Sequence, residues 1–119
     1  ARAWYRETGM PVFAWSSLSG GFFSGRVSRD DTTCMNETCL RAYCREPNFR
    51  RLDRVRELAN AKGVSVPQLA LAWVLNQPLN VFPIVGGATG KEVQSNLKAL
   101  ELTLSQDEQD WLDLKLVEI

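Results

Sequence analysis

The amino-acid sequence predicts an α/β fold with parallel strands. Two short apolar runs, Met10 to Trp15 and Val81 to Val85, have the length of strands and lack polar alternation, which is typical of strands covered on both faces. Segments with helical periodicity precede, separate and follow these runs. Each run leads into a stretch rich in glycine and hydroxyl side chains. Strands that alternate with helical segments indicate parallel α/β units.

The composition is that of an ordinary globular protein. The chain has 119 residues, enough for one small domain, of which 45% are hydrophobic and 24% charged. Fourteen basic residues balance fourteen acidic ones, whereas a protein that binds nucleic acid normally carries a basic excess. No apolar run reaches the length of a membrane span. We therefore expect neither nucleic acid nor a membrane as a partner.

The cysteine pattern favours free thiols. Cys34, Cys39 and Cys44 are odd in number, do not have the spacing of a zinc site, and are accompanied by no histidine. We expect a reduced cytoplasmic protein without a bound metal. The chain begins without methionine, inside a segment of helical character and without the apolar core of a signal peptide. This pattern predicts that an N-terminal portion precedes it.

The first half of the chain contains two predicted helices. The first eight residues form the end of one helix, with Gly9 as its stop. A longer helix runs from Asn48 to Gly63, and its apolar stripe consists of Phe49, Leu52, Val55 and Ala59. Its arginines lie off this stripe among acidic residues, so we expect a solvated charged face rather than a binding patch: Arg50, Arg51, Arg54 and Arg56. Residues 27–46 lack periodicity and predict a long surface loop.

Three capping boxes mark the later helices. Ser65 and Gln68 have the spacing of such a box, in which the two residues at a helix start bond each other's backbone. The body of that helix, LALAWVL, is apolar on nearly every side and predicts burial. The same spacing recurs at the predicted starts of the two following helices: Thr89 with Glu92, and Ser105 with Glu108.

The stretch Val81 to Asn96, VFPIVGGATGKEVQSN, has the pattern of an anion-binding turn. A strand, the Gly86-Gly87 turn and a helix start place free backbone N–H groups and the positive end of a helix beside an approachable backbone. The loop after the first strand, SSLSGGFFSGR at residues 16–26, offers several N–H and O–H donors to one ligand. The alternatives are an ordinary strand-to-helix turn and a Gly/Ser connector.

The chain resembles the C-terminal third of an aldo-keto reductase. PQLALAW, residues 67–73, resembles the helix before the last strand of this family. FAWSSLSGGFFSGR, residues 13–26, resembles the end of the seventh strand and the loop beyond. IVGGATGKEVQSNLKALELTLS, residues 84–105, resembles the eighth strand, the phosphate-binding turn and the final barrel helix. The three motifs occur in the family's order, and only residues 27–46 lie outside the resemblance.

The resemblance implies that residues 1–119 are a C-terminal fragment of an aldo-keto reductase domain. Such a fragment holds the last two strands of a (β/α)8 TIM barrel with their helices, and barrel ligands sit at the C-terminal ends of the strands. The implied activity of the full-length enzyme is the nicotinamide-dependent reduction of small aldehydes or ketones to alcohols. NADP is the expected cofactor, and NAD is the alternative.

The resemblance also assigns cofactor contacts to positions in both loops. Trp15 matches the aromatic residue that stacks on the nicotinamide ring, for which a flat π-face is suited. The positions that match the pyrophosphate and ribose contacts are Ser16, Leu18 and Gly20. The positions that match the turn around the adenosine 2′-phosphate are Gly86, Gly87, Ala88 and Thr89. Asn96 matches an asparagine at the adenine edge, where an amide both donates and accepts.

Two positions depart from the family pattern. Glu92 stands where many relatives carry arginine, lysine or glutamine facing the 2′-phosphate, and Ser95 stands where many carry a glutamate that reaches the adenine amine. A carboxylate near a phosphate is repulsive unless it is paired. Either Glu92 is turned back as the capping-box residue, or the protein prefers NADH. We expect the capping role, with a relaxed choice of cofactor, since Lys91 adjoins Glu92.

No catalytic residue is assigned in this chain. The family's tyrosine, lysine, aspartate and histidine lie in the first half of the barrel, and Tyr5 and Tyr43 do not stand in a matching context. The alternative to an enzyme is a truncated or regulatory subunit that binds a dinucleotide or a partner protein. An unrelated small α/β protein is less favoured. Two parallel strands cannot close a barrel and leave unpaired edges, so we expect the chain alone to be marginally stable, aggregation-prone or dependent on a missing part.

Overall fold

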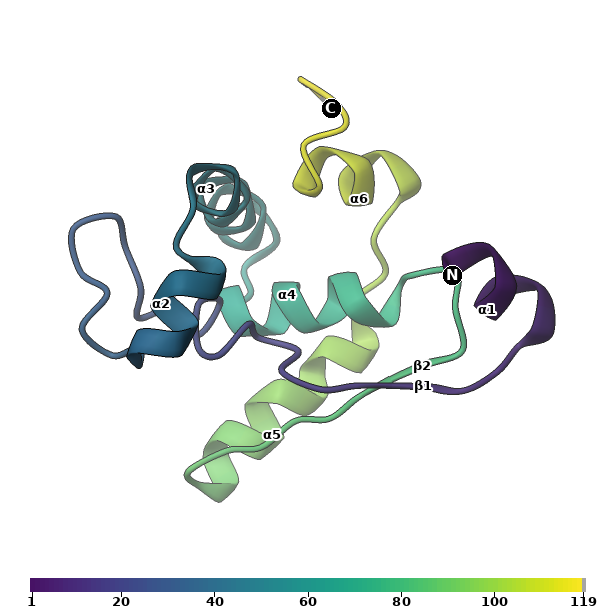
Figure 1. Ribbon diagram of the computed structural model, residues 1–119, viewed down its shortest axis with the longest axis horizontal. Helices are drawn as coiled ribbons and strands as arrows, with labels where there is room; N and C mark the ends of the chain where they lie inside the picture. The colour runs from purple at the N-terminus through teal and green to yellow at the C-terminus, as the bar shows by residue number, and fades with distance from the viewer. Residues whose placement is uncertain (119) are drawn as a thin grey trace.

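A computed structural model describes residues 1–118 as a group of helices with two short strands along one side (Figure 1). The elements in chain order are α1 (Arg2–Thr8), β1 (Val12–Ala14), α2 (Glu37–Tyr43), α3 (Glu46–Lys62), α4 (Val66–Leu75), β2 (Val81–Pro83), α5 (Gly90–Leu97), the 3-10 helix η1 (Lys98–Glu101) and α6 (Gln106–Leu112). Strands therefore alternate with helices along the chain, as the sequence predicts.

The two strands form a parallel pair. Val12 lies opposite Val81, Phe13 opposite Phe82, and Ala14 opposite Pro83. The chain between the strands passes through α2, α3 and α4, as a parallel connection requires. A sheet of two strands is part of a barrel wall and cannot close on itself. The predicted parallel pairing is confirmed, and each described strand is only three residues long.

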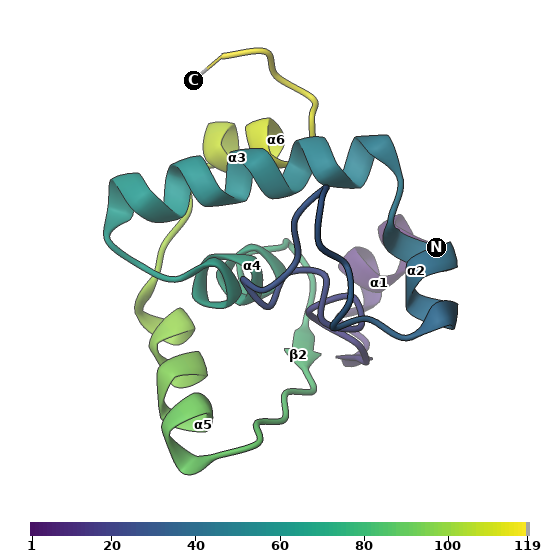
Figure 2. The same ribbon diagram turned by 90° about the vertical axis from the view of Figure 1, so that its left-hand side faces the viewer.

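The main hydrophobic core lies among the helices. α3 crosses over α4, and α6 packs against α3 (Figure 2). Leu69 and Ala72 of α4 are completely buried, which confirms the burial predicted for that helix. The buried members of this core are Val55, Leu58, Ala59, Leu69, Leu71, Ala72, Ala99, Leu104, Trp111 and Leu112.

The helix boundaries follow local chemistry. At the start of α4 the Ser65 hydroxyl accepts the Gln68 N–H at 3.3 Å, and the Ser65 N–H donates to the Gln68 side chain at 2.9 Å. Ser105 and Glu108 form the same reciprocal pair at the start of α6, at 3.1 and 2.9 Å. Glycines in left-handed backbone end two helices, namely Gly9 after α1 and Gly63 after α3. These predicted boundaries are confirmed.

The prediction of one long surface loop at residues 27–46 is wrong in part, although most of the segment does lie at the surface. Helix α2 lies inside this segment, and Asn36 caps it by accepting the Cys39 N–H at 2.9 Å. Val27 and Met35 are buried, and together with Phe22 they form a second hydrophobic cluster. A seven-residue helix is too short to show a clear period in the sequence. Its formation depends instead on packing against the loop after β1.

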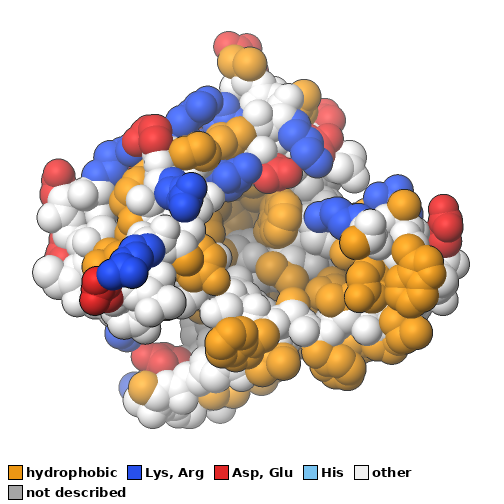
Figure 3. Space-filling model, in the orientation of Figure 1, with side chains coloured by type: hydrophobic (Ala, Val, Ile, Leu, Met, Phe, Trp, Pro, Cys, Tyr) orange, Lys and Arg blue, Asp and Glu red, His pale blue; other side chains and the backbone are white. Residues whose placement is uncertain are grey.

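The burial predicted for both faces of the strands is also wrong. Phe13 is 69% exposed and Phe82 is 48% exposed, and the two rings stack on each other with centroids 5.5 Å apart. Val81 and Pro83 alternate with these residues and are half-buried on the side of α4. In Figure 3 hydrophobic side chains gather over this part of the molecule. The described helices thus cover only one face of the pair.

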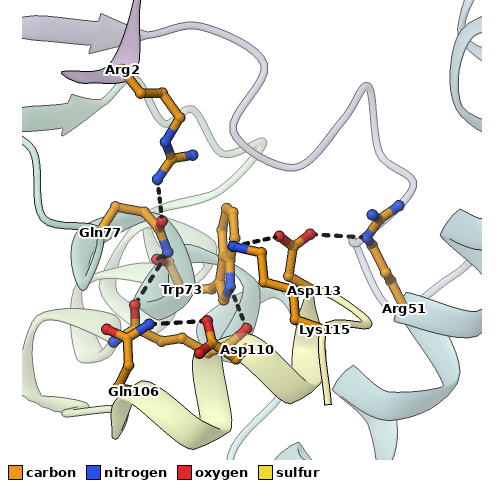
Figure 4. A network of polar contacts seen from close by, with 9 residues as sticks. Arg2, Arg51, Trp73, Gln77, Gln106, Asp110, Asp113 and Lys115 are labelled. Carbon is orange, nitrogen blue, oxygen red and sulfur yellow. Dashed lines mark hydrogen bonds and ion pairs between the residues drawn. The ribbon is translucent and has the colours of Figure 1, made fainter. Parts of the chain in front are cut away.

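The solvated arginine face predicted for α3 is wrong where α3 meets α6. Arg54 donates to the backbone carbonyls of Trp111 and of Leu116, the latter at 2.7 Å, and its guanidinium lies 5.0 Å from the centre of the Trp111 ring. Arg51 pairs with Asp113 at 3.3 Å, as Figure 4 shows. Arg54 thus gives the Trp111 carbonyl a second donor beside the Leu114 N–H, whereas Arg51 pairs with a carboxylate just after α6.

A third arginine of α3 is also engaged. Arg56 donates to the backbone carbonyl of Val27 and so holds the start of the segment at residues 27–46 against α3. Arg50 is exposed, as expected for a solvated face. The prediction failed because charge patterning reports only on the helix itself. It carries no information about which neighbouring carbonyls need a donor.

Candidate functional site

The loops after β1 and β2 begin at the same edge of the sheet. Ala14 lies opposite Pro83, and the Ile84 N–H donates to the Ala14 carbonyl at 2.9 Å. Trp15 therefore leaves its strand beside the chain that continues toward Gly86. The carboxyl ends of parallel strands are where α/β folds place their ligands. The two stretches singled out in the sequence thus meet at the expected edge.

The first loop, residues 16–26, has a fixed and strained shape. Ser16 and Ser19 adopt left-handed backbone with φ of 57° and 54°, a conformation that costs roughly 1 kcal/mol or more for a residue other than glycine. Leu18 packs against the main core, and Phe22 is completely buried in the second cluster. Because the loop is anchored in both clusters, its backbone groups are held in place before any ligand binds.

Gly20 marks a close approach between this loop and α2. Its φ is 62°, and a Cβ atom at this position would lie 2.3 Å from the Cys39 sulfur. Both the backbone conformation and the available space therefore require glycine. The loop conformation consequently depends on α2, an element that the sequence pattern did not predict.

The second loop carries an anion already bonded to its backbone. Thr89 caps α5 by accepting the Glu92 N–H at 3.2 Å, as predicted. The Glu92 carboxylate turns back as predicted, but it accepts the Ala88 N–H at 2.8 Å rather than the N–H of Thr89. The expected capping box is therefore only half formed. The turn therefore holds a carboxylate at the Ala88 backbone donor.

An ion pair joins the two loops. Nη2 of Arg26, at the end of the first loop, lies 3.3 Å from Oε1 of Glu92, and the two side chains are 72% and 41% exposed. A pair this exposed adds little stability and opens readily. Sequence reasoning missed Arg26, because its partner is 66 residues away. The available signal was its place at the end of a loop rich in donors.

Gly87 lets the second turn approach the start of α5. A Cβ atom there would lie 3.1 Å from the Glu92 Cβ and 3.2 Å from the Val93 nitrogen. These distances are tighter than ordinary contacts, so a side chain would push the turn away from the helix. Gly86, by contrast, has open space around it.

The candidate residues do not share one cavity. Trp15, which is 84% exposed, and Ser16 line a cavity of about 470 Å³ bounded by β1, α3, α4 and α6. The hollow at the centre of Figure 3 lies in this region. Gly86 and Asn96 line a second cavity of about 270 Å³ between β2, α4 and α5. The structure therefore brings the two loops together at their bases, while Trp15 and Asn96 face separate spaces.

Residues 1–118 contain no group of three or more His, Cys, Asp or Glu side chains placed to hold a metal ion. Within the same range, no helix combines the length and apolar character that crossing a membrane requires. The chemistry that this edge offers consists of backbone N–H groups, hydroxyls, one guanidinium and an exposed indole. Groups of these kinds can bind and orient an anionic, ring-bearing ligand.

Comparison with known proteins identifies the family. The model of the aldo/keto reductase family matches residues 2–116, so this chain belongs to that family. Members of this family fold as a (β/α)8 barrel and typically use a nicotinamide cofactor. The two parallel strands with their helices are consistent with part of such a barrel.

The chain aligns with only part of each of several longer relatives. It is 31% identical to an uncharacterized oxidoreductase, YrpG, of Bacillus subtilis (strain 168), over 86% of this chain and 31% of that protein. It is 30% identical to versiconal hemiacetal acetate reductase of Aspergillus parasiticus, over 90% of this chain and 32% of that protein. A probable voltage-gated potassium channel subunit beta of Oryza sativa subsp. japonica is 28% identical over 82% of this chain and 32% of that protein. The chain thus spans about a third of these relatives.

Proposed function

We propose that this chain is the C-terminal, cofactor-binding portion of a nicotinamide-dependent reductase of aldehydes or ketones. The observation that carries the proposal is that two donor-bearing loops begin at one sheet edge and are joined farther along by the ion pair of Arg26 and Glu92 at 3.3 Å. Family membership supports an oxidoreductase. The complete protein takes small carbonyl substrates, and the specificity comes from barrel loops outside these residues.

The second turn fits a phosphate. The Glu92 carboxylate on the Ala88 N–H, at 2.8 Å, is an anion in a position that a phosphate oxygen can take. The absence of a side chain at Gly87 allows the backbone to approach closely. We assign the adenosine 2′-phosphate to the turn formed by Gly86, Gly87, Ala88 and Thr89. Arg26 is a further cation within reach of this turn, and its planar guanidinium suits phosphate oxygens.

The remaining assignments concern orientation of the cofactor. Trp15 stacks on the nicotinamide ring, and its exposure leaves the indole face free for this contact. Asn96 bonds the adenine edge. The residues assigned to the pyrophosphate and adjoining ribose are Ser16, Leu18 and Gly20. The bound cofactor supplies hydride chemistry, whereas these residues bind and orient it, and the proton donors lie outside this chain.

We propose that the protein discriminates only weakly between NADP and NAD. Glu92 opposes a 2′-phosphate, while Arg26 attracts one and neutralises Glu92 when no phosphate is present. Comparing the catalytic efficiency of the full-length protein with NADPH and NADH tests this directly. We expect values within about tenfold of each other, a difference of about 1.4 kcal/mol. A strong NADPH preference contradicts the relaxed choice.

We infer a reducing compartment, the cytoplasm, for the protein. Cys34, Cys39 and Cys44 are all free thiols in the structure. Free thiols are ordinary in reducing compartments and uncommon in oxidising ones. Mapping the oxidation state of the three thiols in freshly lysed cells tests this inference.

A second candidate function is a non-catalytic subunit that binds a dinucleotide or a partner protein. The observation in its favour is the similarity to the probable potassium channel subunit beta of rice. The two functions differ in whether the barrel strands outside this chain carry an aspartate, a tyrosine, a lysine and a histidine in that order.

The deciding experiment begins with the coding sequence upstream of Ala1. If the four catalytic residue types are present there, we expect the full-length product to consume NADPH or NADH when an aldehyde or ketone is added. Saturable cofactor binding without turnover of any carbonyl in a broad panel favours the regulatory subunit. Absence of both binding and turnover contradicts the proposed function.

A further inference from the structure

A buried glutamine joins the helix before β2 to the helix after it. The Gln68 side chain is only 7% exposed. Its Oε1 accepts the Ser65 N–H at 2.9 Å, and its Nε2 donates to the carbonyl of Ser95 at 2.9 Å and to the Ser95 hydroxyl at 3.1 Å. One amide therefore completes the cap of α4 and fastens the middle of α5.

Helix α5 has few other attachments within residues 1–118. None of its residues is buried, and Val93 and Leu97 are 45% and 56% exposed. Its described contacts are chiefly with α4 and with η1, the 3-10 turn that follows it. The ion pair from Arg26 to Glu92 is largely exposed and weak. Hydrogen bonds of a buried amide are by contrast costly to leave unmade, so they fix the helix strongly.

The fastened point lies within the candidate binding residues of α5. Ser95 directly precedes Asn96 and follows Glu92 by one helical turn, and Thr89 caps the same helix. A shift or rotation of α5 displaces all of these groups together. Gln68 itself lies in the first turn of α4 and belongs to neither candidate loop.

We propose that Gln68 is a positioning residue for the adenosine end of the cofactor. It acts through Ser95 by setting the position of α5, and so of Asn96 and of the turn at residues 86–89. This inference rests on the proposed function of the second loop. It requires an amide, because the same side chain must accept from Ser65 and donate to Ser95.

The chain offers a matched control in Gln109. Its side chain is 8% exposed, donates to the Leu104 carbonyl at 3.1 Å, and accepts from the Gln77 side chain at 3.4 Å. It lies in α6, which packs chiefly against α3 and carries none of the candidate binding residues. Gln68→Glu and Gln109→Glu both keep the acceptor and remove the donating amide from a buried site. Any loss of stability should therefore be comparable.

The experiment measures the affinity of the full-length protein for two halves of the cofactor by calorimetry. The probes are adenosine 2′,5′-bisphosphate and nicotinamide mononucleotide. We expect Gln68→Glu to weaken the adenosine probe on the order of tenfold and to leave the mononucleotide within about twofold. Gln109→Glu should change neither affinity. With NADPH, Gln68→Glu should raise KM while kcat stays within about twofold.

The outcomes separate this inference from the function on which it rests. If the unaltered protein binds neither probe, the proposed cofactor site itself fails and the inference fails with it. If the unaltered protein binds the adenosine probe and Gln68→Glu binds it equally well, only the positioning role is overturned. Should Gln68→Glu not fold, Ser95→Ala removes one of the two acceptors on α5 while sparing the core. It should weaken the adenosine probe alone by about threefold, and an unchanged affinity overturns the inference.

Discussion

The helical side of this molecule is well buried and well capped, whereas the strand side is more exposed and less completely capped. α3, α4 and α6 bury a continuous core, and two of them begin with complete capping boxes. β1, β2 and α5 expose Phe13, Phe82 and Leu97, and α5 has only half of its expected cap. The candidate binding residues are concentrated on the less buried side. The part that carries the proposed function is therefore the part that most needs the rest of a barrel.

This difference shows how the proposed site depends on the fold. The helical side satisfies its own backbone through caps and arginine contacts, so its geometry is set by residues within this chain. Among the described helices, α4 makes the main contact with β2, whereas parallel strands are normally covered on both faces. The loops keep their shape through anchors in the helical side, namely Leu18, Phe22 and Gln68. Four predictions test this contrast.

The largest expected effect is on the isolated chain. Residues 1–119 by themselves should not unfold cooperatively as a monomer, because the uncovered strands and α5 leave apolar surface and strand edges open. Thermal unfolding followed by circular dichroism, together with sedimentation, measures this. A sharp, reversible transition of a purified monomer would show that the strand side needs no cover.

A large effect is expected where the first loop meets α2. In the full-length protein Gly20→Ala should lower the free energy of unfolding by about 3 kcal/mol, from left-handed strain plus the clash with Cys39. Gly9→Ala has the same strain and no atom within 4 Å, so it should cost about 1 kcal/mol. Denaturant titration measures both. Adding Cys39→Ala should recover part of the loss at Gly20, and equal costs for the two single variants contradict the close packing.

A moderate effect on stability is expected at two helix caps. Ser105→Ala on the helical side and Thr89→Ala on the strand side each remove one cap hydrogen bond, so each should cost about 1 kcal/mol of stability. Only Thr89→Ala should also weaken NADPH binding in the full-length protein, since Thr89 belongs to the proposed phosphate turn. Calorimetric titration of both variants checks this. Equal affinities would place the turn outside the binding site.

Much of the local structure could be predicted from sequence because its causes are local. Ser65 and Gln68, Ser105 and Glu108, and the stop at Gly9 each act within a few residues, and the structure has them as expected. Two apolar runs separated by helices sufficed to predict a parallel pair.

What sequence reasoning missed depends on contacts between distant segments. The contacts of Arg54 with α6 and of Arg26 with Glu92 join residues 57 and 66 positions apart. Helix α2 is too short to produce a clear helical period in the sequence. The cap residue Asn36, followed by Leu40 and Tyr43 at helical spacing, was only a weak sign of it. The exposure of Phe13 could not be predicted, because an apolar strand pattern indicates burial on both faces of a complete sheet, whereas the described helices cover one face of this pair.

The smallest expected effect is a pH dependence on the helical side. Burial by itself raises the pKa of Glu108, but the hydrogen bond and charge of Lys62 and the backbone N–H of Ser105 outweigh it and hold this pKa below its ordinary value. The stabilisation is therefore present above the ordinary pKa of 4.5 and is lost as pH falls through the lowered value. Denaturant titrations between neutral and acid pH should show a loss that Glu108→Gln reduces. An unchanged pH profile in that variant contradicts this role.

The central claim is that the two strand-end loops bind one nicotinamide dinucleotide. Its most direct test is calorimetric titration of the full-length protein with NADPH, alongside Trp15→Ala in the first loop and Gly87→Ala in the second. We predict saturable binding of one NADPH per chain, weakened about fivefold or more by each substitution, because one removes a stacking face and the other displaces the turn. Absence of binding, or affinities that neither substitution alters, would contradict the account.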